Sequence, residues 1–345
     1  MSVCKSLFGI NKDGKEIYAY LIENSKGNRI QCITLGACLQ KVEIKDKDDK
    51  YIDLLLGFDD VEGFEKRHDF QGMTVGPVAN RISDGLTIDG VKIAVTKTHG
   101  DVTLHSNGDF SSAVWNAIIT DTDSVEFSYI HPDGKDGFPG NIDTKVKYRF
   151  TEDDEIIISY DAVSDKKTAL NITNHSYFNL KGYDGGDILD HRLYLNADAF
   201  TPMNDDLIPS GEIRPVENTP FDFRSPKPIG RDINEDYDQL KAGNGYDHNF
   251  VLNDYDGKVR LIASLEAPSG VKLDCFTDLP GVQLYVGNFL KGVSGKAGLP
   301  LNFRCGLCLE TQYFPNASNT PNFKNYIFDA GEHFISKTIY KISVK

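Results

Sequence analysis

The chain has 345 residues, of which 40% are apolar, 26% charged and 11% aromatic, a composition that excludes a disordered or fibrous protein. Its 37 Lys and Arg against 51 Asp and Glu give a formal net charge of −14, which repels polyanions and argues against nucleic acid as a partner. No segment approaches the roughly 20 apolar residues that span a bilayer, and no leader-like apolar run follows Lys5. We therefore predict a cytoplasmic protein that does not bind membranes.

Strand-like segments, rich in β-branched and aromatic residues, recur along the chain at residues 145–150, 155–162, 191–196, 271–276, 282–286 and 306–314. Turn sequences separate them at residues 107–108, 133–134, 209–211 and 256–257. Helical periodicity does not persist beyond about ten residues, which argues against βαβ units and a parallel sheet. No internal repeat or linker-like segment interrupts the pattern. The sequence therefore predicts an all-β fold, a large antiparallel β-sandwich, with residues 1–345 forming a single domain.

Cysteine usage fits a reducing compartment, because six cysteines are too few for a disulfide scaffold in a chain of this length. We predict that all six are thiols of the core. Cys305 and Cys308 form a C-x-x-C pair, but no second pair and no closely spaced His completes a zinc site. We predict no metal.

Glu310 stands out because of the segment around it, Leu-Cys-Leu-Glu-Thr-Gln at residues 307–312. In a strand, alternation places Cys308, Glu310 and Gln312 on one face and the intervening residues on the other. A carboxylate would then stand among uncharged neighbours. Such surroundings raise the pKa of a carboxyl group toward the range that serves proton transfer at neutral pH.

The same alternation in residues 281–288 puts Gln283 and Tyr285 on one face, opposite Val282 and Leu284. Aromatic rings cover the apolar face of a pyranose, while amides bond its hydroxyls. This face is compatible with a sugar-binding surface and equally with a half-buried structural strand.

Seven motifs occur in a fixed order along the chain: TVGPVANRI at 74–82, LH at 104–105, NHSYFNL at 174–180, AD at 197–198 with TPFDF at 219–223, GYDH at 245–248, GNFL at 287–290, and LETQ at 309–312 followed by Pro315. Together they resemble the aldose 1-epimerase family along nearly the whole length. Two positions depart from its patterns. Pro77 stands where Arg is common, and Ser106 with Asn107 replaces Gly-Gly after His105. Ser tolerates a positive φ poorly, whereas Asn adopts it more readily.

This resemblance implies the fold, a galactose mutarotase-like supersandwich, and the activity, interconversion of the α and β anomers of free hexoses such as galactose and glucose. It implies that Glu310 is the catalytic base and His175 the acid, and a carboxylate with an imidazolium suits proton transfer near pH 7. No cofactor is required. It further implies that four residues bind and orient the sugar: Asn80, Arg81, His105 and Asp247.

Three alternatives stay open. Two His and two carboxylates could ligate a metal, although no H-x-H or H-x-x-x-H spacing supports this. The chain could also be a non-catalytic sugar-binding protein on the same fold. The third is an epimerase of a disaccharide or of a hexose 6-phosphate. Arg81 is the clear cation around the matched motifs, so the sequence favours a neutral hexose over a phosphate.

Overall fold

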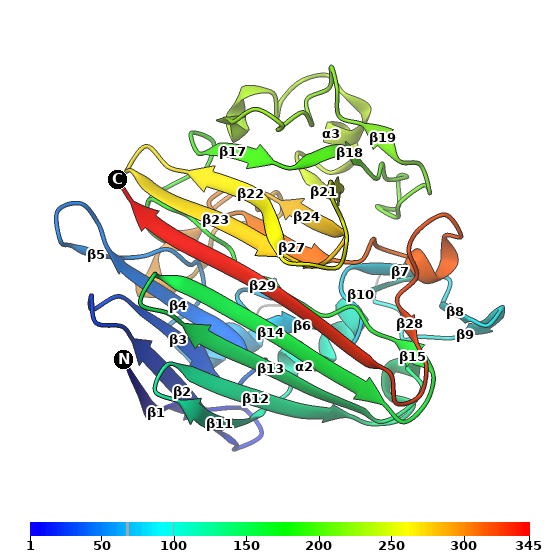
Figure 1. The fold of residues 1–345 in the computed structure, drawn as a ribbon, viewed down its shortest axis with the longest axis horizontal. Helices are drawn as coiled ribbons and strands as arrows, with labels where there is room; N and C mark the ends of the chain where they lie inside the picture. The colour runs from blue at the N-terminus through cyan, green and yellow to red at the C-terminus, as the bar shows by residue number, and fades with distance from the viewer. Residues whose placement is uncertain (67–68, 99) are drawn as a thin grey trace.

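The computed structural model describes residues 1–66, 69–98 and 100–345. Antiparallel strands dominate it, and their long axes run side by side across the molecule (Figure 1). The largest sheet has nine strands, in the spatial order β11 (Asn116–Asp121), β12 (Ser124–His131), β13 (Ile142–Phe150), β14 (Glu155–Ser164), β29 (His333–Val344), β23 (Val271–Thr277), β22 (Arg260–Glu266), β17 (Arg192–Leu195) and β20 (Lys227–Pro228).

Two five-stranded sheets accompany it. The N-terminal one has the order β1 (Ser2–Ile10), β2 (Glu16–Glu23), β3 (Arg29–Ile33), β4 (Cys38–Lys45), β5 (Tyr51–Asp53). The other, in which the site is built, has the order β19 (Arg214–Pro215), β18 (Ala197–Phe200), β21 (Asp247–Leu252), β24 (Gly281–Tyr285), β27 (Cys308–Gln312).

Short strand pairs and turns connect the sheets. The pairs are β6 (Thr74–Val75) with β16 (Thr173–Asn174), β7 (Arg81–Ser83) with β10 (Val102–Leu104), β8 (Leu86–Ile88) with β9 (Val91–Ile93), β15 (Thr168–Ala169) with β28 (Ile327–Phe328), and β25 (Val293–Ser294) with β26 (Pro300–Leu301). The described helices are short: α1 (Val61–Lys66), α2 (Asp109–Ser112) and α3 (Asp238–Ala242). None of the described helices has the length and apolar character needed to cross a membrane.

Period-two burial explains why these segments form sheets. Along β14, buried and half-exposed residues alternate without a break, and β13 alternates buried with polar positions in the same way. The inward side chains of all three sheets meet in one core, which includes Tyr20 of β2, Ile158 of β14 and Val282 of β24. Burying each large apolar side chain contributes about 1.5–3 kcal/mol, so this core is the main source of stability.

The predicted all-β antiparallel sandwich is confirmed, and each of the six predicted strand segments overlaps an observed strand. Segment 306–314 is longer than the strand it contains, since β27 spans Cys308–Gln312. The prediction for the cysteines is wrong at one position. Cys4 is exposed, because β1 is an edge strand whose residues are mostly exposed, while the other five thiols are buried.

Candidate active site

An open cleft lies beside β21, β24 and β27, and the segments before β7, around β10 and after β16 also contribute to its lining. Its lining brings together seven of the eight residues singled out in the sequence, and Gln283 is the one that it does not include. The described lining residues are Asp69, Phe70, Asn80, Arg81, Leu104, His105, His175, Tyr177, Asp247, Tyr285, Phe289 and Glu310.

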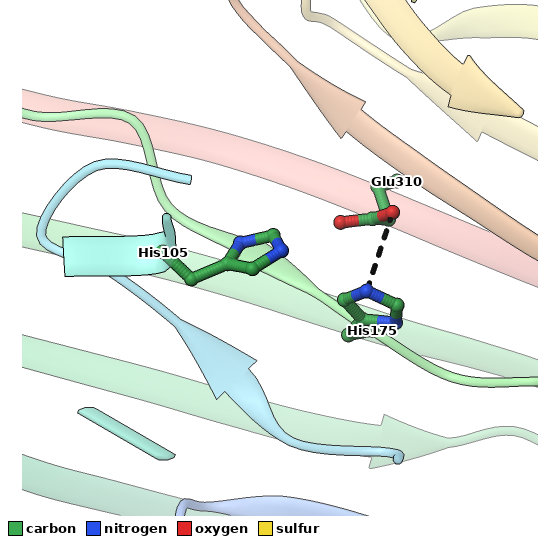
Figure 2. A group of neighbouring side chains, drawn as sticks. All are labelled: His105, His175 and Glu310. Carbon is green, nitrogen blue, oxygen red and sulfur yellow. Dashed lines mark ion pairs between the residues drawn. The ribbon is translucent and has the colours of Figure 1, made fainter. Parts of the chain in front are cut away.

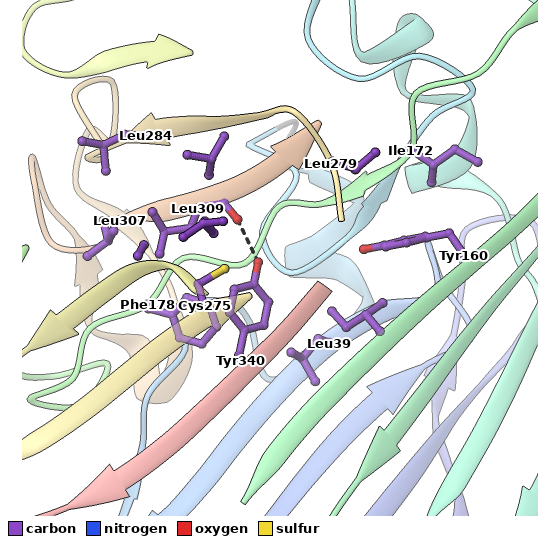
Figure 3. Close-up of a cluster of buried hydrophobic side chains, with 14 of the residues drawn as sticks. Leu39, Tyr160, Ile172, Phe178, Cys275, Leu279, Leu284, Leu307, Leu309 and Tyr340 are labelled. Atoms are coloured by element: carbon purple, nitrogen blue, oxygen red, sulfur yellow. Dashed lines mark hydrogen bonds between the residues drawn. The ribbon is translucent and has the colours of Figure 1, made fainter. Parts of the chain in front are cut away.

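Glu310 occupies the middle of β27 and is paired in register with Gln283 of β24. The predicted alternation holds. Cys308 and Glu310 face His175, whereas Leu309 packs in the core and the Thr311 hydroxyl is hydrogen-bonded to Thr338 of β29. There the Leu309 carbonyl accepts a hydrogen bond from the Tyr340 hydroxyl at 2.8 Å (Figure 3). The strand that carries the carboxyl group is therefore held by a hydrogen bond on the face that points away from the cleft.

His175 follows β16 and is held through its backbone. Its N–H donates to the Met73 carbonyl at 2.9 Å, and its own carbonyl accepts from the Gly72 N–H at 2.9 Å. Its side chain points at Glu310, with Nε2 at 3.6 Å from Oε1 of the carboxyl group (Figure 2). On the other side of the ring, Nδ1 lies 3.3 Å from the Cys308 sulfur. The two residues are separated by 135 positions in sequence and meet only through the tertiary fold.

Burial sets the protonation of this pair. It raises the pKa of Glu310 well above the ordinary value, with the Asp247 carboxylate adding to the rise. It lowers the pKa of His175 to about 4. The raised pKa of Glu310 agrees with the sequence prediction. Desolvation disfavours the charged form of each group, so in the free protein burial favours the neutral carboxyl beside the neutral imidazole.

Glu310 also has an unused acceptor. Its Oε2 atom is buried and has no hydrogen-bond partner among the described residues. A ligand hydroxyl that donates to Oε2 would stabilise the carboxylate and lower the pKa of Glu310. Ligand binding would thereby favour movement of the shared proton to His175.

His105 lies at the start of a 3-10 turn, His105–Gly108, with its ring edge against His175 and centroids 5.3 Å apart. The backbone N–H of Asn80 donates to its Nδ1 at 3.1 Å, so the proton of the neutral ring is on Nε2. Burial, with His175 and Arg81 nearby, lowers the pKa of His105 well below its ordinary value. The ring is a fixed neutral N–H donor.

The departure after His105 is compensated locally. Ser106 has φ 50° and Asn107 φ 59°, so both adopt the left-handed conformation that glycine favours. The Ser106 hydroxyl donates to the Val78 carbonyl and accepts from the Val78 N–H, both at 2.9 Å. Asn107 adopts the conformation that the sequence predicts as accessible to it. Pro77, the other departure, is buried and its carbonyl accepts from Asn171 N–H at 2.8 Å.

Arg81 and Asp247 form a polar wall of the cleft. Arg81 Nη2 lies 3.9 Å from Asp247 Oδ2, and Gln283 donates to Asp247 Oδ1 at 2.7 Å. Gln283 thus stands behind the wall and orients Asp247, instead of lining the cleft as the strand pattern suggested. The backbone N–H of Arg81 donates to the Asn80 side-chain oxygen at 2.8 Å, which fixes the amide that faces the cleft.

Aromatic rings that the sequence did not single out complete the lining. Tyr177 stacks on His175 with centroids 5.0 Å apart, and Phe289 stacks on Tyr285 at 6.3 Å. Tyr177 and Phe289 lie inside the motifs at residues 174–180 and 287–290, so their positions in these motifs could have marked them as lining residues. Phe70 contacts both histidine rings and lies in a segment without any recognised motif.

His105, His175 and Glu310 offer atoms within 4.8 Å of one another, a spacing that could hold a metal ion. The hydrogen bond to His105 does not fit this use. A ligating His normally donates its second N–H to an acceptor, whereas Nδ1 of His105 accepts from a backbone N–H and leaves the proton on Nε2, which faces the cleft. The cluster therefore suits proton transfer better than metal binding.

We expect exhaustive chelation to leave catalysis unchanged, because the carboxyl and imidazole groups move protons without a metal. Turnover rates, measured before and after dialysis against a strong chelator, test this. Loss of activity that one divalent ion restores would contradict the expectation.

Comparisons with known proteins agree with this geometry. The family model for aldose 1-epimerase matches residues 18–341. Galactose mutarotase of Bos taurus is 37% identical over 347 residues, covering 100% of this chain and 99% of that protein. Aldose 1-epimerase of Escherichia coli is 33% identical over 334 residues, covering 95% and 96%. The crystal structure of galactose 1-epimerase from Lactobacillus acidophilus superposes with a TM-score of 0.88 at 27% identity, covering 100% and 99%.

Proton transfer on a small polyhydroxylated molecule is the chemistry that this cleft supports, which places the chain among acid–base enzymes that act on sugars. The chain belongs to the aldose 1-epimerase family. It is accordingly an isomerase of sugar anomers, with the β-sandwich fold shared by its solved relatives.

Proposed function

We propose that the protein interconverts the α and β anomers of a free, neutral hexose and accepts both galactose and glucose. The observation that carries this proposal is the buried pair of Glu310 and His175, 3.6 Å apart, at the base of a cleft lined with hydroxyl-binding groups. Relatives named galactose mutarotase support the choice of hexose.

In this proposal Glu310, as carboxylate, removes the proton from the anomeric hydroxyl. The electrons of that O–H bond form the carbonyl, the bond between C1 and the ring oxygen breaks, and His175 delivers its proton to the ring oxygen. The open aldehyde rotates about its C1–C2 bond. Closure on the other face returns both protons with the roles of the two groups exchanged, so the pair ends as it began.

The remaining polar groups orient the sugar. His105 presents a neutral N–H donor toward the ring-oxygen side, and Asn80, Arg81 and Asp247 bond hydroxyls. Tyr285 offers an aromatic face, and Gln283 acts by holding Asp247. Charge-assisted hydrogen bonds, to Arg81 and Asp247, fix the orientation more strongly than neutral ones.

The net lining charge favours a neutral sugar over a phosphate. Arg81 is the one Lys or Arg among the described lining residues, and Asp247 faces it. Dianionic phosphate is usually bound by several convergent cations or a helix N-terminus.

We also propose that residues 1–345 act as one domain. Because all six described thiols are free, we further propose that the protein works in the reducing cytoplasm.

We expect catalytic efficiency on galactose and glucose to exceed that on maltose and on glucose 6-phosphate. Exchange of the anomeric proton signals at equilibrium, followed by NMR, measures all four sugars in one buffer without isolating pure anomers. A tenfold preference for the phosphate, about 1.4 kcal/mol of transition-state discrimination, would overturn the choice of substrate. The same preference for maltose would indicate a disaccharide epimerase.

The pH dependence follows from the single proton of the pair. Below about pH 4, His175 gains a second proton and the pair loses its base. Above the raised pKa of Glu310, the pair loses its proton and no acid remains. On the acidic side we expect kcat/KM to stay level down to about pH 5 and to fall as the pH approaches the pKa of His175. Rates extrapolated to zero buffer concentration test this, and a decline that begins near pH 6.5 would contradict it.

A further inference from the structure

A second, larger cavity adjoins the catalytic cleft. Its volume is about 680 Å³, against about 120 Å³ for the cleft. Phe70 and Leu104 line both spaces and so form the boundary between them.

Phe70 is held at this boundary in an unusual conformation. Its φ is 57°, in the left-handed region that a bulky side chain rarely adopts. Its ring lies 4.7 Å from the ring of His105 and 6.0 Å from that of His175, almost parallel to the latter. Strained residues of this kind persist where the surroundings fix them, typically at functional sites.

The position of Phe70 indicates which part of the sugar it limits. On the proposed function, His175 serves the ring oxygen and Glu310 serves the anomeric carbon. The ring oxygen is also bonded to C5, which carries the exocyclic C6. Phe70 packs on the two histidines, so it faces the C5 and C6 end of the hexose.

The chemistry of the second cavity suits an uncharged, hydroxyl-rich group. Lys12 and Lys97 contribute positive charge, and Asp13 and Glu65 balance it. Lys97 is also ion-paired with Asp101. Ser111 and Ser112 lie in the same wall, and their hydroxyls donate to backbone carbonyls, which leaves each oxygen able to accept a hydrogen bond. Such a mixture favours a neutral sugar unit over a phosphate group.

We propose that Phe70 and Leu104 are specificity-determining residues that block extension of the bound sugar through C6, and that their removal opens the second cavity to a sugar unit linked at that carbon. This inference rests on the proposed function, because it assumes catalysis at the anomeric carbon. The sugars that it excludes are those that carry a further sugar unit on C6.

The experiment compares glucose, isomaltose, whose reducing unit carries its partner on C6, and maltose, which carries it on C4. Phe70→Asn is the informative variant because Asn adopts a positive φ more readily than other residues. Phe70→Tyr keeps the ring and serves as the matched control. Leu104→Ala tests the other half of the boundary and keeps the question answerable if Phe70→Asn does not fold.

We expect wild type and Phe70→Tyr to prefer glucose to isomaltose. In Phe70→Asn and in Leu104→Ala, the ratio of kcat/KM for isomaltose to that for glucose should rise at least about tenfold, with the maltose ratio unchanged. An equal fall for all three sugars would make Phe70 a packing residue and overturn the proposal, as would a gain for maltose alone. Absence of glucose turnover in wild type would instead defeat the proposed function.

Discussion

Replacement of Glu310 by Gln is expected to lower kcat by about 10²–10⁴-fold, the usual contribution of one proton-transfer group, while the sugar still binds. The amide keeps the shape of the side chain and its contact with His175 but cannot accept the anomeric proton. Polarimetry of freshly dissolved α-galactose gives the rate, and the dependence on sugar concentration separates kcat from KM.

The matched control is Glu217→Gln, since Glu217 is an exposed carboxylate whose nearest cation, Arg224, lies 4.0 Å away. It makes the same replacement of a carboxyl by an amide at an exposed position outside the cleft and should leave activity at the wild-type level. Full activity in Glu310→Gln would exclude Glu310 as the base. Loss of activity in both variants would show that the loss is not specific to the cleft.

Stability offers a second readout for Glu310→Gln. The pKa of this carboxyl is raised in the folded state, so the unfolded chain releases its proton at a lower pH than the folded one. Its contribution to stability is therefore complete below the unfolded pKa of about 4.3 and is lost as pH rises through the folded value. Removal of the ionisable group should make the melting temperature at pH 8 equal to or higher than that of wild type.

Local pattern was sufficient to predict part of the site. Strand alternation alone placed Glu310 beside Cys308 on one face, because the period of a strand is two whatever surrounds it. The same rule put Gln283 and Tyr285 on a common face, yet only Tyr285 lines the cleft. The Gln283 amide donates its hydrogen bond to Asp247 of the neighbouring strand instead. The sequence of one strand does not show which residues lie beside it in the sheet.

Other features depend on tertiary burial and could not be derived from pattern. The protonation of Glu310 and His175 is set by desolvation, which a sequence does not report. The left-handed Ser106 was unexpected because its compensation, two hydrogen bonds to Val78, joins segments 28 positions apart. Phe70 lies in no motif, and its role at the cleft is visible only through its contacts with the two histidine rings.

Replacement of His175 by Asn is expected to lower kcat by about 10²-fold or more, because it removes the group that protonates the ring oxygen. The fold should persist, since the backbone of His175 is held by Met73 and Gly72 independently of the ring. His333→Asn is the matched control, an exposed histidine on β29 paired with Asp161. It should retain wild-type turnover.

The pH dependence of stability and of kcat/KM in the His175→Asn variant shows whether His175 is an acid or a binding group. In wild type, burial lowers the pKa of His175 to about 4. As the pH falls, His175 therefore takes up a proton in the unfolded chain before it does so in the folded protein. The folded state consequently loses stability as the pH falls from about 6.5 toward 4. In thermal melts, the His175→Asn variant should lose less stability than wild type as the pH falls. Its residual kcat/KM should no longer decline near pH 4. A variant with unchanged kcat and a raised KM would instead make His175 a binding residue, and Glu310 would then need another acid.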